Sequence, residues 1–147
     1  MLKKYEKRIE YMEELFIPIK DENEVNLMNP LVWAYAGDCI HELYIRTHLI
    51  NTTKDKVHEL HIKTSQYVKA TAQAQALKNI EDILTEEEKD IVRRTRNTGN
   101  HHLPKNVSSA DYMYATAFEG LIGYLYLTKR YTRLKEILDL SLEKGNK

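Results

Sequence analysis

Two apolar stretches with helical spacing, residues 31–49 and 110–127, constrain the fold of this chain more than any other feature. Each has a carboxylate embedded among packing residues, Asp38 in the first and Glu119 in the second. A carboxylate on a buried helix face is costly unless it is paired, hydrogen-bonded or bound to a cation. Because two such helices must pack together, the pair predicts an all-oxygen site for a hard metal ion, with Mg²⁺ the natural choice.

The neighbours of Asp38 sharpen this prediction. Gly37 stands in the helix interior, where glycine costs about 1 kcal/mol relative to alanine, so we expect another backbone or a ligand to approach closely there. Glu42 has an ordinary partner one turn later in Arg46 and is interpreted as structural, although a role as a ligand stays open. Asp38 and Glu119 have no basic residue four positions on, so their cation must come from elsewhere.

The composition indicates one globular domain. A chain of 147 residues can bury one core and is too short for two ordinary domains. No apolar run approaches the roughly 20 residues that span a bilayer, and the N-terminus lacks the core of a signal peptide, so we expect a cytoplasmic protein without membrane contact. The only cysteine, Cys39, excludes an internal disulfide and is expected to be a buried thiol.

The spacing of apolar residues, with only five glycines and three prolines, predicts an all-α fold. Besides the two apolar helices, we expect an N-terminal helix over residues 3–16, a polar break over 20–26, two helices within 57–84 that bend near Ala70, and a last helix over 132–144. We divide the chain into an N-terminal extension, 1–26, and one catalytic domain, 27–147.

The sequence also indicates where several helices begin. Asn29 and Pro30 suit the start of the first apolar helix, and Ser109 can cap the second. Thr85 and Glu88 form a capping box for a short helix, after which residues 95–108 are predicted to be an irregular loop.

One segment is strongly basic although the whole chain has a net charge of +0. From Arg93 to Lys105 there are four basic residues and no acidic one. Arginine clamps phosphate oxygens by paired hydrogen bonds, so a basic segment beside a metal site fits recognition of a nucleic-acid backbone. A solvated charged loop is the plain alternative. The candidate RNA contacts are Arg93, Arg94, Arg96, Asn97, Lys105 and Asn106.

Four segments in order carry a resemblance to a known family: Ala34–Tyr44 (AYAGDCIHELY), Arg93–Asn97 (RRTRN), Pro104–Asn106 (PKN) and Tyr114–Leu125 (YATAFEGLIGYL). Over residues 28–143 the chain resembles Mini-ribonuclease III, a branch of the ribonuclease III family that lacks the separate double-stranded-RNA-binding domain. In this resemblance Asp38 matches the aspartate of the Gly-Asp signature and Glu119 matches the glutamate of the second acidic motif.

The resemblance implies a homodimeric, all-α ribonuclease III endonuclease domain that cleaves double-stranded RNA with Mg²⁺, with Mn²⁺ as a substitute. It implies maturation of the 23S ribosomal RNA precursor, products with 5′-phosphate and 3′-hydroxyl ends, and a ribosomal protein on the same RNA as a helper. Asp38 and Glu119 would be both metal ligands and catalytic residues. The full ribonuclease III pattern has two more carboxylates, where this chain has Ala34 and Thr116, so one metal ion with several waters is expected.

Three other functions remain open at this point. The thin set of carboxylates leaves a non-catalytic, dimeric RNA-binding or ribosome-associated module of the same fold as the main alternative. An all-α nucleotide pyrophosphatase would also use helix-borne acids and Mg²⁺, but its acids cluster at short spacing. A helical interaction protein would explain the apolar helices but not Asp38 and Glu119 together.

Overall fold

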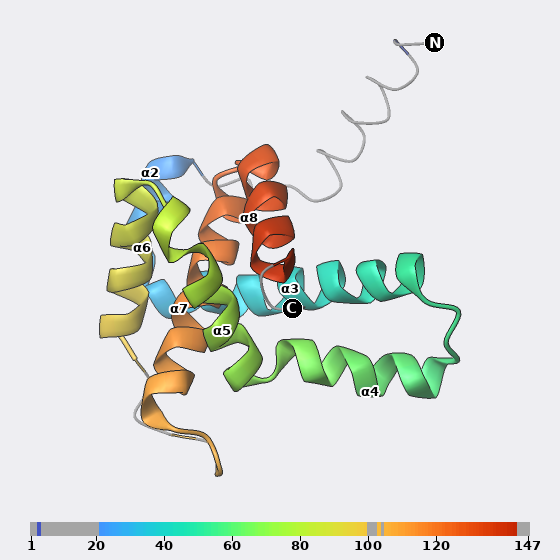
Figure 1. The fold of residues 1–147 in the computed structure, drawn as a ribbon. Helices are drawn as coiled ribbons and strands as arrows, with labels where there is room; N and C mark the ends of the chain where they lie inside the picture. The colour runs from blue at the N-terminus through green and yellow to red at the C-terminus, as the bar shows by residue number, and fades with distance from the viewer. Residues whose placement is uncertain (1–2, 4–20, 100–102, 104, 144–147) are drawn as a thin grey trace.

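A computed structural model describes residues 3, 21–99, 103 and 105–143, and within these ranges its regular secondary structure consists of helices joined by short turns and loops (Figure 1). Its elements are α2 (Glu22–Leu27), α3 (Pro30–Thr52), α4 (Val57–Val68), α5 (Ala70–Ile80), the 3₁₀ turn η1 (Glu81–Ile83), α6 (Glu86–Asn97), α7 (Ser109–Leu127) and α8 (Tyr131–Glu143). The predicted all-α fold is confirmed for this part of the chain.

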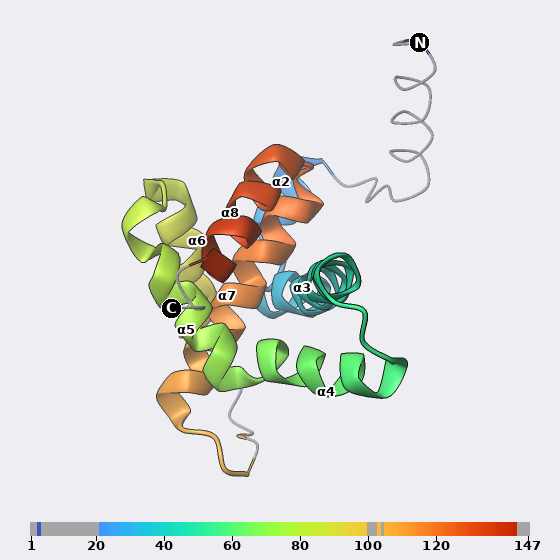
Figure 2. The same ribbon diagram turned by 45° about the vertical axis from the view of Figure 1, so that its right-hand side comes forward.

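Helix α7 runs through the middle of the molecule, and α3 crosses it (Figures 1 and 2). Helices α5, α6 and α8 pack around α7, whereas the second half of α3 continues away from the core and pairs with α4 as a long hairpin. No helix in the described ranges combines the length and the apolarity that crossing a bilayer requires.

The core forms where the apolar stripes of α5, α7 and α8 meet. Its largest cluster has fully buried side chains such as Leu77, Phe118 and Ile137. A smaller cluster surrounds Trp33, whose indole packs edge-on against Tyr124 at 5.2 Å and donates a 2.8 Å hydrogen bond to the Val25 carbonyl. Burial of these large side chains is the main driving force for the fold.

Local sequence rules set most helix ends. The Asn29 side chain accepts from the Leu31 N–H at 2.9 Å, and Pro30 opens α3 as predicted. The Thr85–Glu88 capping box is present, with hydrogen bonds of 2.9 and 3.1 Å in its two directions. Helix α7 is capped by Ser108 rather than Ser109.

The structure differs from the sequence-based expectations in three places. The polar break over 20–26 contains a short helix, α2, which Asp21 caps and Val25 anchors in the core. Helix α6 continues to Asn97, so three of the four basic residues of the predicted loop, Arg93, Arg94 and Arg96, lie on a helix. The thiol of Cys39 is exposed, not buried. The predicted N-terminal helix falls almost wholly outside the described residues.

Candidate functional site

The site begins at the crossing of α3 and α7, where two glycines bring the backbones into contact. A Cβ atom on Gly37 would lie 1.7 Å from the Glu119 carbonyl oxygen, and one on Gly123 would lie 1.7 Å from the Trp33 carbonyl oxygen. Neither position can hold a side chain at this separation. The close approach predicted at Gly37 is therefore that of another backbone, and it brings the two acid-bearing helix segments together.

Asp38 and Glu119 meet at this crossing. Their carboxyl groups are hydrogen-bonded to each other, with Asp38 exposed and Glu119 half-buried. Burial, followed by the hydrogen bond and the charge of Asp38, raises the pKa of Glu119 to about 9. At neutral pH Glu119 therefore keeps its proton, which lies between the two carboxyl groups, because two adjacent carboxylates resist ionising together.

A divalent oxygen-seeking cation fits this pair, since it replaces the shared proton and balances both carboxylates. The set of protein ligands is small, because no group of three or more His, Cys, Asp or Glu side chains converges anywhere in the described ranges. Glu42 instead pairs with Arg46 at 3.3 Å, as its spacing predicted. Most positions around the ion would be left to water and to substrate oxygens, a mode of binding that Mg²⁺ tolerates.

The full ribonuclease III pattern has carboxylates at two further positions, but this chain has buried, uncharged residues there. Ala34 is 7% exposed and Thr116 is 9% exposed. The Thr116 hydroxyl donates a 2.9 Å hydrogen bond to the Tyr112 carbonyl within α7. These residues contribute packing and no ligand, which leaves Asp38 and Glu119 as the acids of the site.

Helix α6 packs on α7 directly beside Glu119. A Cβ atom on Gly120 would lie 2.4 Å from the Oγ1 of Thr95, whose side chain is fully buried. Because Thr95 precedes Arg96 and Gly120 follows Glu119, this contact fixes the last turn of α6 against the segment of α7 that carries the acid.

The predicted RNA contacts differ in their surroundings. The Arg94 guanidinium donates a 2.9 Å hydrogen bond to the Asn26 carbonyl and stacks over the Trp33 ring at 4.9 Å, so it has a place in the packing of α2, α3 and α6. Arg93 pairs with Asp90 on the surface of α6.

Arg96 and Lys105 have no ion-pair partner in the described part of the chain, and their charges remain available. Arg96 is half-buried, whereas Lys105 is exposed, as are Asn97 and Asn106. Asn106 has a positive φ of 68°, a left-handed conformation that asparagine tolerates better than most residues. These four residues, together with Arg93, form the basic turn that we refer to below.

One side of α3 exposes a row of apolar residues, which is broken by the exposed Arg46 and Thr47 before Ile50. Its residues recur at helical spacing over the length of the helix, with exposed fractions of 45% for Val32, 84% for Tyr35, 58% for Leu43 and 65% for Ile50, and Cys39 lies in the same row. Exposed apolar residues grouped along one side of a helix mark a site of protein contact more often than scattered single residues do. We name these five residues the α3 stripe.

Two buried polar pairs were not predicted. Arg133 on α8 binds the carboxylate of Glu88 at 2.8 and 2.9 Å, and Glu88 also belongs to the capping box of α6. His41 on α3 accepts a 3.0 Å hydrogen bond at its Nδ1 from the Gln73 amide on α5. Both pairs join helices that are distant in sequence, and no local spacing signals such contacts.

Comparison with known proteins identifies the family. A family model, the ribonuclease III domain, matches residues 31–130. The chain is 51% identical to a Mini-ribonuclease 3 of Thermoanaerobacter sp. (strain X514) over 79% of this chain and 82% of that protein. It is 38% identical to a Mini-ribonuclease 3 of Staphylococcus aureus (strain NCTC 8325 / PS 47) over 82% of this chain and 91% of that protein.

A solved structure shares the fold. The crystal structure of a protein from Fusobacterium nucleatum superposes with a TM-score of 0.75 at 29% identity, covering 83% of this chain and 98% of that chain. The segment matched by the family model contains Asp38, Glu119 and the basic end of α6. The chain belongs to the Mini-ribonuclease III branch of the ribonuclease III family and is an endoribonuclease.

Proposed function

We propose that the chain is a homodimeric, Mg²⁺-dependent endonuclease that cleaves double-stranded RNA and matures the ends of the 23S ribosomal RNA precursor. The observation that carries the metal-dependent reaction is the Asp38–Glu119 pair, two hydrogen-bonded carboxyl groups on crossing helices. Family membership supports the class of substrate, and the ribosomal target is carried over from the resemblance to Mini-ribonuclease III.

Asp38 and Glu119 would hold the ion, with Mn²⁺ as a substitute. When bound, a divalent ion supplies Lewis-acid stabilisation of the phosphate and activates water for in-line attack. Glu119 lies on the buried side of the pair and must give up its proton as the ion binds. Asp38 lies on the exposed side, where a backbone phosphate can approach. Cleavage in this manner leaves 5′-phosphate and 3′-hydroxyl ends.

The basic turn at the end of α6 would hold the RNA. Those of its residues that lie on α6 are held near Glu119 by the contact of Thr95 with Gly120. An A-form duplex exposes phosphates and 2′-hydroxyls, and side chains cannot read its narrow major groove. Contacts from Arg96, Asn97 and Lys105 would therefore recognise the shape of the duplex rather than its sequence. A ribosomal protein on the same RNA would add to this binding.

The α3 stripe would be the surface through which two copies associate. A two-fold dimer is the commonest closed assembly, and it presents the same patch from both subunits. Asp38 lies on α3 beside this stripe. A dimer formed there would relate two acid pairs by its two-fold axis, so that each subunit can address one strand of a duplex.

The test is a cleavage assay on a long labelled RNA duplex and its single strand, with Mg²⁺ and with EDTA. We expect cleavage of the duplex alone and only with the metal. Asp38→Asn should reduce cleavage by more than about 100-fold, beyond the effect typical of residues that only orient metal ligands. Its duplex affinity and thermal unfolding should stay close to those of the wild type, because Asp38 is exposed.

A second function is kept open by the small set of acids. Ala34 and Thr116 supply no ligands, and a site with two carboxylates could serve an RNA-binding module without catalysis. Duplex binding by the wild-type protein without Mg²⁺-dependent cleavage would favour this module. Unfolding of Asp38→Asn would instead assign Asp38 to the stability of the fold.

A further inference from the structure

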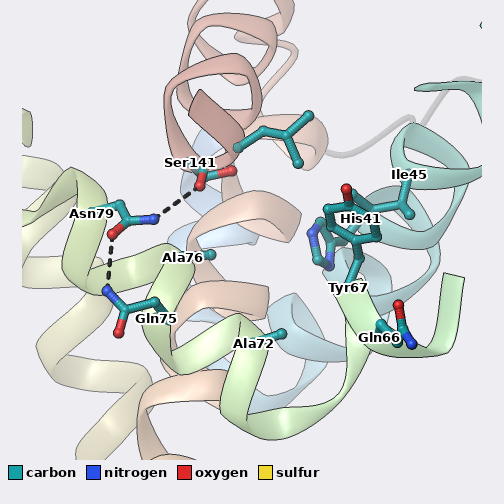
Figure 3. Close-up of a pocket in the computed structure, with 10 residues that line it drawn as sticks. His41, Ile45, Gln66, Tyr67, Ala72, Gln75, Ala76, Asn79 and Ser141 are labelled. Carbon is teal, nitrogen blue, oxygen red and sulfur yellow. Dashed lines mark hydrogen bonds between the residues drawn. The ribbon is translucent and has the colours of Figure 1, made fainter. Parts of the chain in front are cut away.

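A cavity of about 310 Å³ lies between α3, α4, α5 and α8, apart from the acid pair (Figure 3). Neither Asp38 nor Glu119 lines it. Six of its lining residues carry polar groups: His41, Gln66, Tyr67, Gln75, Asn79 and Ser141. The reaction proposed above uses none of them.

The buried imidazole of His41 has an unused ring nitrogen at this cavity. His41 is 3% exposed, and its Nδ1 forms the 3.0 Å hydrogen bond with Gln73. Its Nε2 has no hydrogen-bond partner among the described residues. Because Nδ1 accepts from the Gln73 amide, the neutral ring carries its proton on Nε2, and an acceptor on an occupant of the cavity would complement this N–H.

The opposite wall offers amide groups in a fixed arrangement. The Gln75 amide donates to the Asn79 Oδ1 at 2.9 Å, and the Asn79 amide donates to the Ser141 carbonyl at 3.2 Å. Figure 3 shows this chain of groups on one side and His41 with Tyr67 on the other, with Ala72 and Ala76 of α5 between them. Small side chains on α5 leave the space between the two walls open.

The lining limits the ligand by charge and size. No Asp, Glu, Lys or Arg lines the cavity, and burial lowers the pKa of His41 to about 4, so the imidazole is neutral at pH 7. An ionic group would lose its hydration without gaining a counter-charge. The volume is at the lower end of the roughly 300–1,000 Å³ typical of small-molecule pockets, which suits one compact ring system.

We propose that this cavity binds a nucleobase, as a neutral planar ring with donors and acceptors on its edge. The Gln66 carboxamide presents a donor and an acceptor side by side and can pair with the edge of a base, whereas the Gln75 and Asn79 amides are joined to each other and to Ser141. Aromatic rings such as those of Tyr67 and His41 can stack on or flank the face of a base. The base can belong to a free nucleoside or to an unpaired nucleotide of an RNA, and the same chemistry serves both.

The experiment is a titration of the ¹⁵N-labelled full chain with adenosine, guanosine, cytidine and uridine, followed by amide NMR shifts and by thermal unfolding. At least one nucleoside should bind saturably with half-saturation below about 1 mM. The shifts should centre on α5, the end of α4 and the end of α8. The corresponding 5′-monophosphate should bind at least fivefold more weakly, because no cation lines the cavity.

Two variants and a matched control fix the location. Ala72→Leu fills the cavity and should abolish binding, whereas Thr71→Leu changes an exposed neighbour on α5 and should leave the affinity within twofold. Gln75→Ala at the exposed rim should weaken binding at least threefold without affecting the fold. It replaces Ala72→Leu as the test variant if Ala72→Leu is poorly folded.

The two sources of the base are separated with a short duplex that carries one unpaired nucleotide and with the same duplex fully paired. Cavity shifts that appear only with the unpaired nucleotide assign the base to RNA, whereas cavity shifts with nucleosides alone assign it to a free nucleoside. Either result supports the proposal. Shifts centred on Asp38 and Glu119, binding that survives Ala72→Leu, or no binding of any of these probes would overturn it.

Discussion

At the scale of single residues, Glu119 is the group on which the pH dependence of metal binding rests. Its pKa is raised to about 9 by burial and by Asp38, so it is protonated at neutral pH in the free protein. A metal ion requires the deprotonated form, and each bound ion must therefore release a proton. We expect the affinity for Mn²⁺ or Mg²⁺ to rise between pH 6 and pH 9, by up to about tenfold per pH unit.

Calorimetric titrations in buffers of different ionisation enthalpy measure both the affinity and the number of protons released. The comparison is Glu119→Gln, which cannot release this proton and should bind the ion weakly with little pH dependence. A metal affinity of the wild-type protein that stays flat over this range would show that Glu119 is already ionised, and it would contradict the shared proton.

His41 gives a second prediction at this scale, now for stability. Burial lowers its pKa from 6.5 to about 4, and Asp38 opposes this effect only in part. The unfolded chain therefore binds the proton more readily than the folded chain between these two values. This contribution to stability is complete above pH 6.5 and is lost as the pH falls to 4, amounting to about 3 kcal/mol at 1.36 kcal/mol per pKa unit.

Urea unfolding of the wild-type protein and of His41→Phe, each at several pH values, tests this contribution. At pH 7 the variant should be less stable by about 1–3 kcal/mol, because the Gln73 amide is left buried without a partner. Its loss of stability between pH 6.5 and 4 should be smaller than that of the wild type. Parallel curves for the two proteins would assign the acid sensitivity to other groups.

At the scale of elements, α6 combines two kinds of arginine that the sequence alone does not separate. Arg94 is bound to the Asn26 carbonyl and to the face of Trp33, whereas Arg96 has no ion-pair partner in the described ranges. We expect Arg96→Ala to weaken duplex binding uniformly across sequences and to lower the slope of log K against log salt by about 1. Its thermal unfolding should change little.

Arg94→Ala is the matched variant on the same helix. It should lower the free energy of unfolding by about 1–2 kcal/mol, through loss of a hydrogen bond and a cation–π contact. Binding isotherms at three salt concentrations, together with melting curves, separate the two effects. Equal salt slopes for Arg96→Ala and the wild type would remove the end of α6 from the RNA surface.

The elements also show which parts of the fold can be read from sequence. The caps at Asn29 and Thr85 are local, and α3 and α7 are long, predominantly apolar stretches, so those helices were predicted within a few residues. Helix α2 was missed because its six residues hold a single buried side chain, Val25. The meeting of Asp38 with Glu119 was predictable because each acid stands next to a glycine on an apolar helix. Their shared proton depends on the distance between the two side chains, which the sequence does not give.

At the scale of the whole molecule, the fold explains why Cys39 was wrongly expected to be buried. Apolar residues surround Cys39 in the sequence, and periodicity cannot distinguish a side that faces the core of one chain from a side that faces another chain. The structure buries Trp33, Ile45 and Leu49 of α3 and exposes the α3 stripe. Helix α3 therefore has apolar residues on its buried side and on its exposed side. Such a helix is expected at an interface between two copies of the chain.

The proposed dimer gives the last prediction. Tyr35 is 84% exposed, and Tyr35→Glu should leave the fold of one chain intact while converting the dimer to a monomer in sedimentation. A charge in the centre of an apolar interface loses its hydration without a partner, which costs several kcal/mol. The monomer should retain metal binding, because Asp38 and Glu119 belong to the same chain, but it should cut a long duplex poorly.

Cys39 provides an independent measurement, since it is the only cysteine and lies in the α3 stripe. A short bismaleimide should link two wild-type copies through this residue, and Tyr35→Glu should abolish the link. Lys129→Glu, an exposed change after α7, is the control and should leave both sedimentation and crosslinking unchanged. If Tyr35→Glu remains a dimer and the wild-type protein does not crosslink at Cys39, the interface does not lie on α3. The proposed two-fold relation between the acid pairs would then also be wrong.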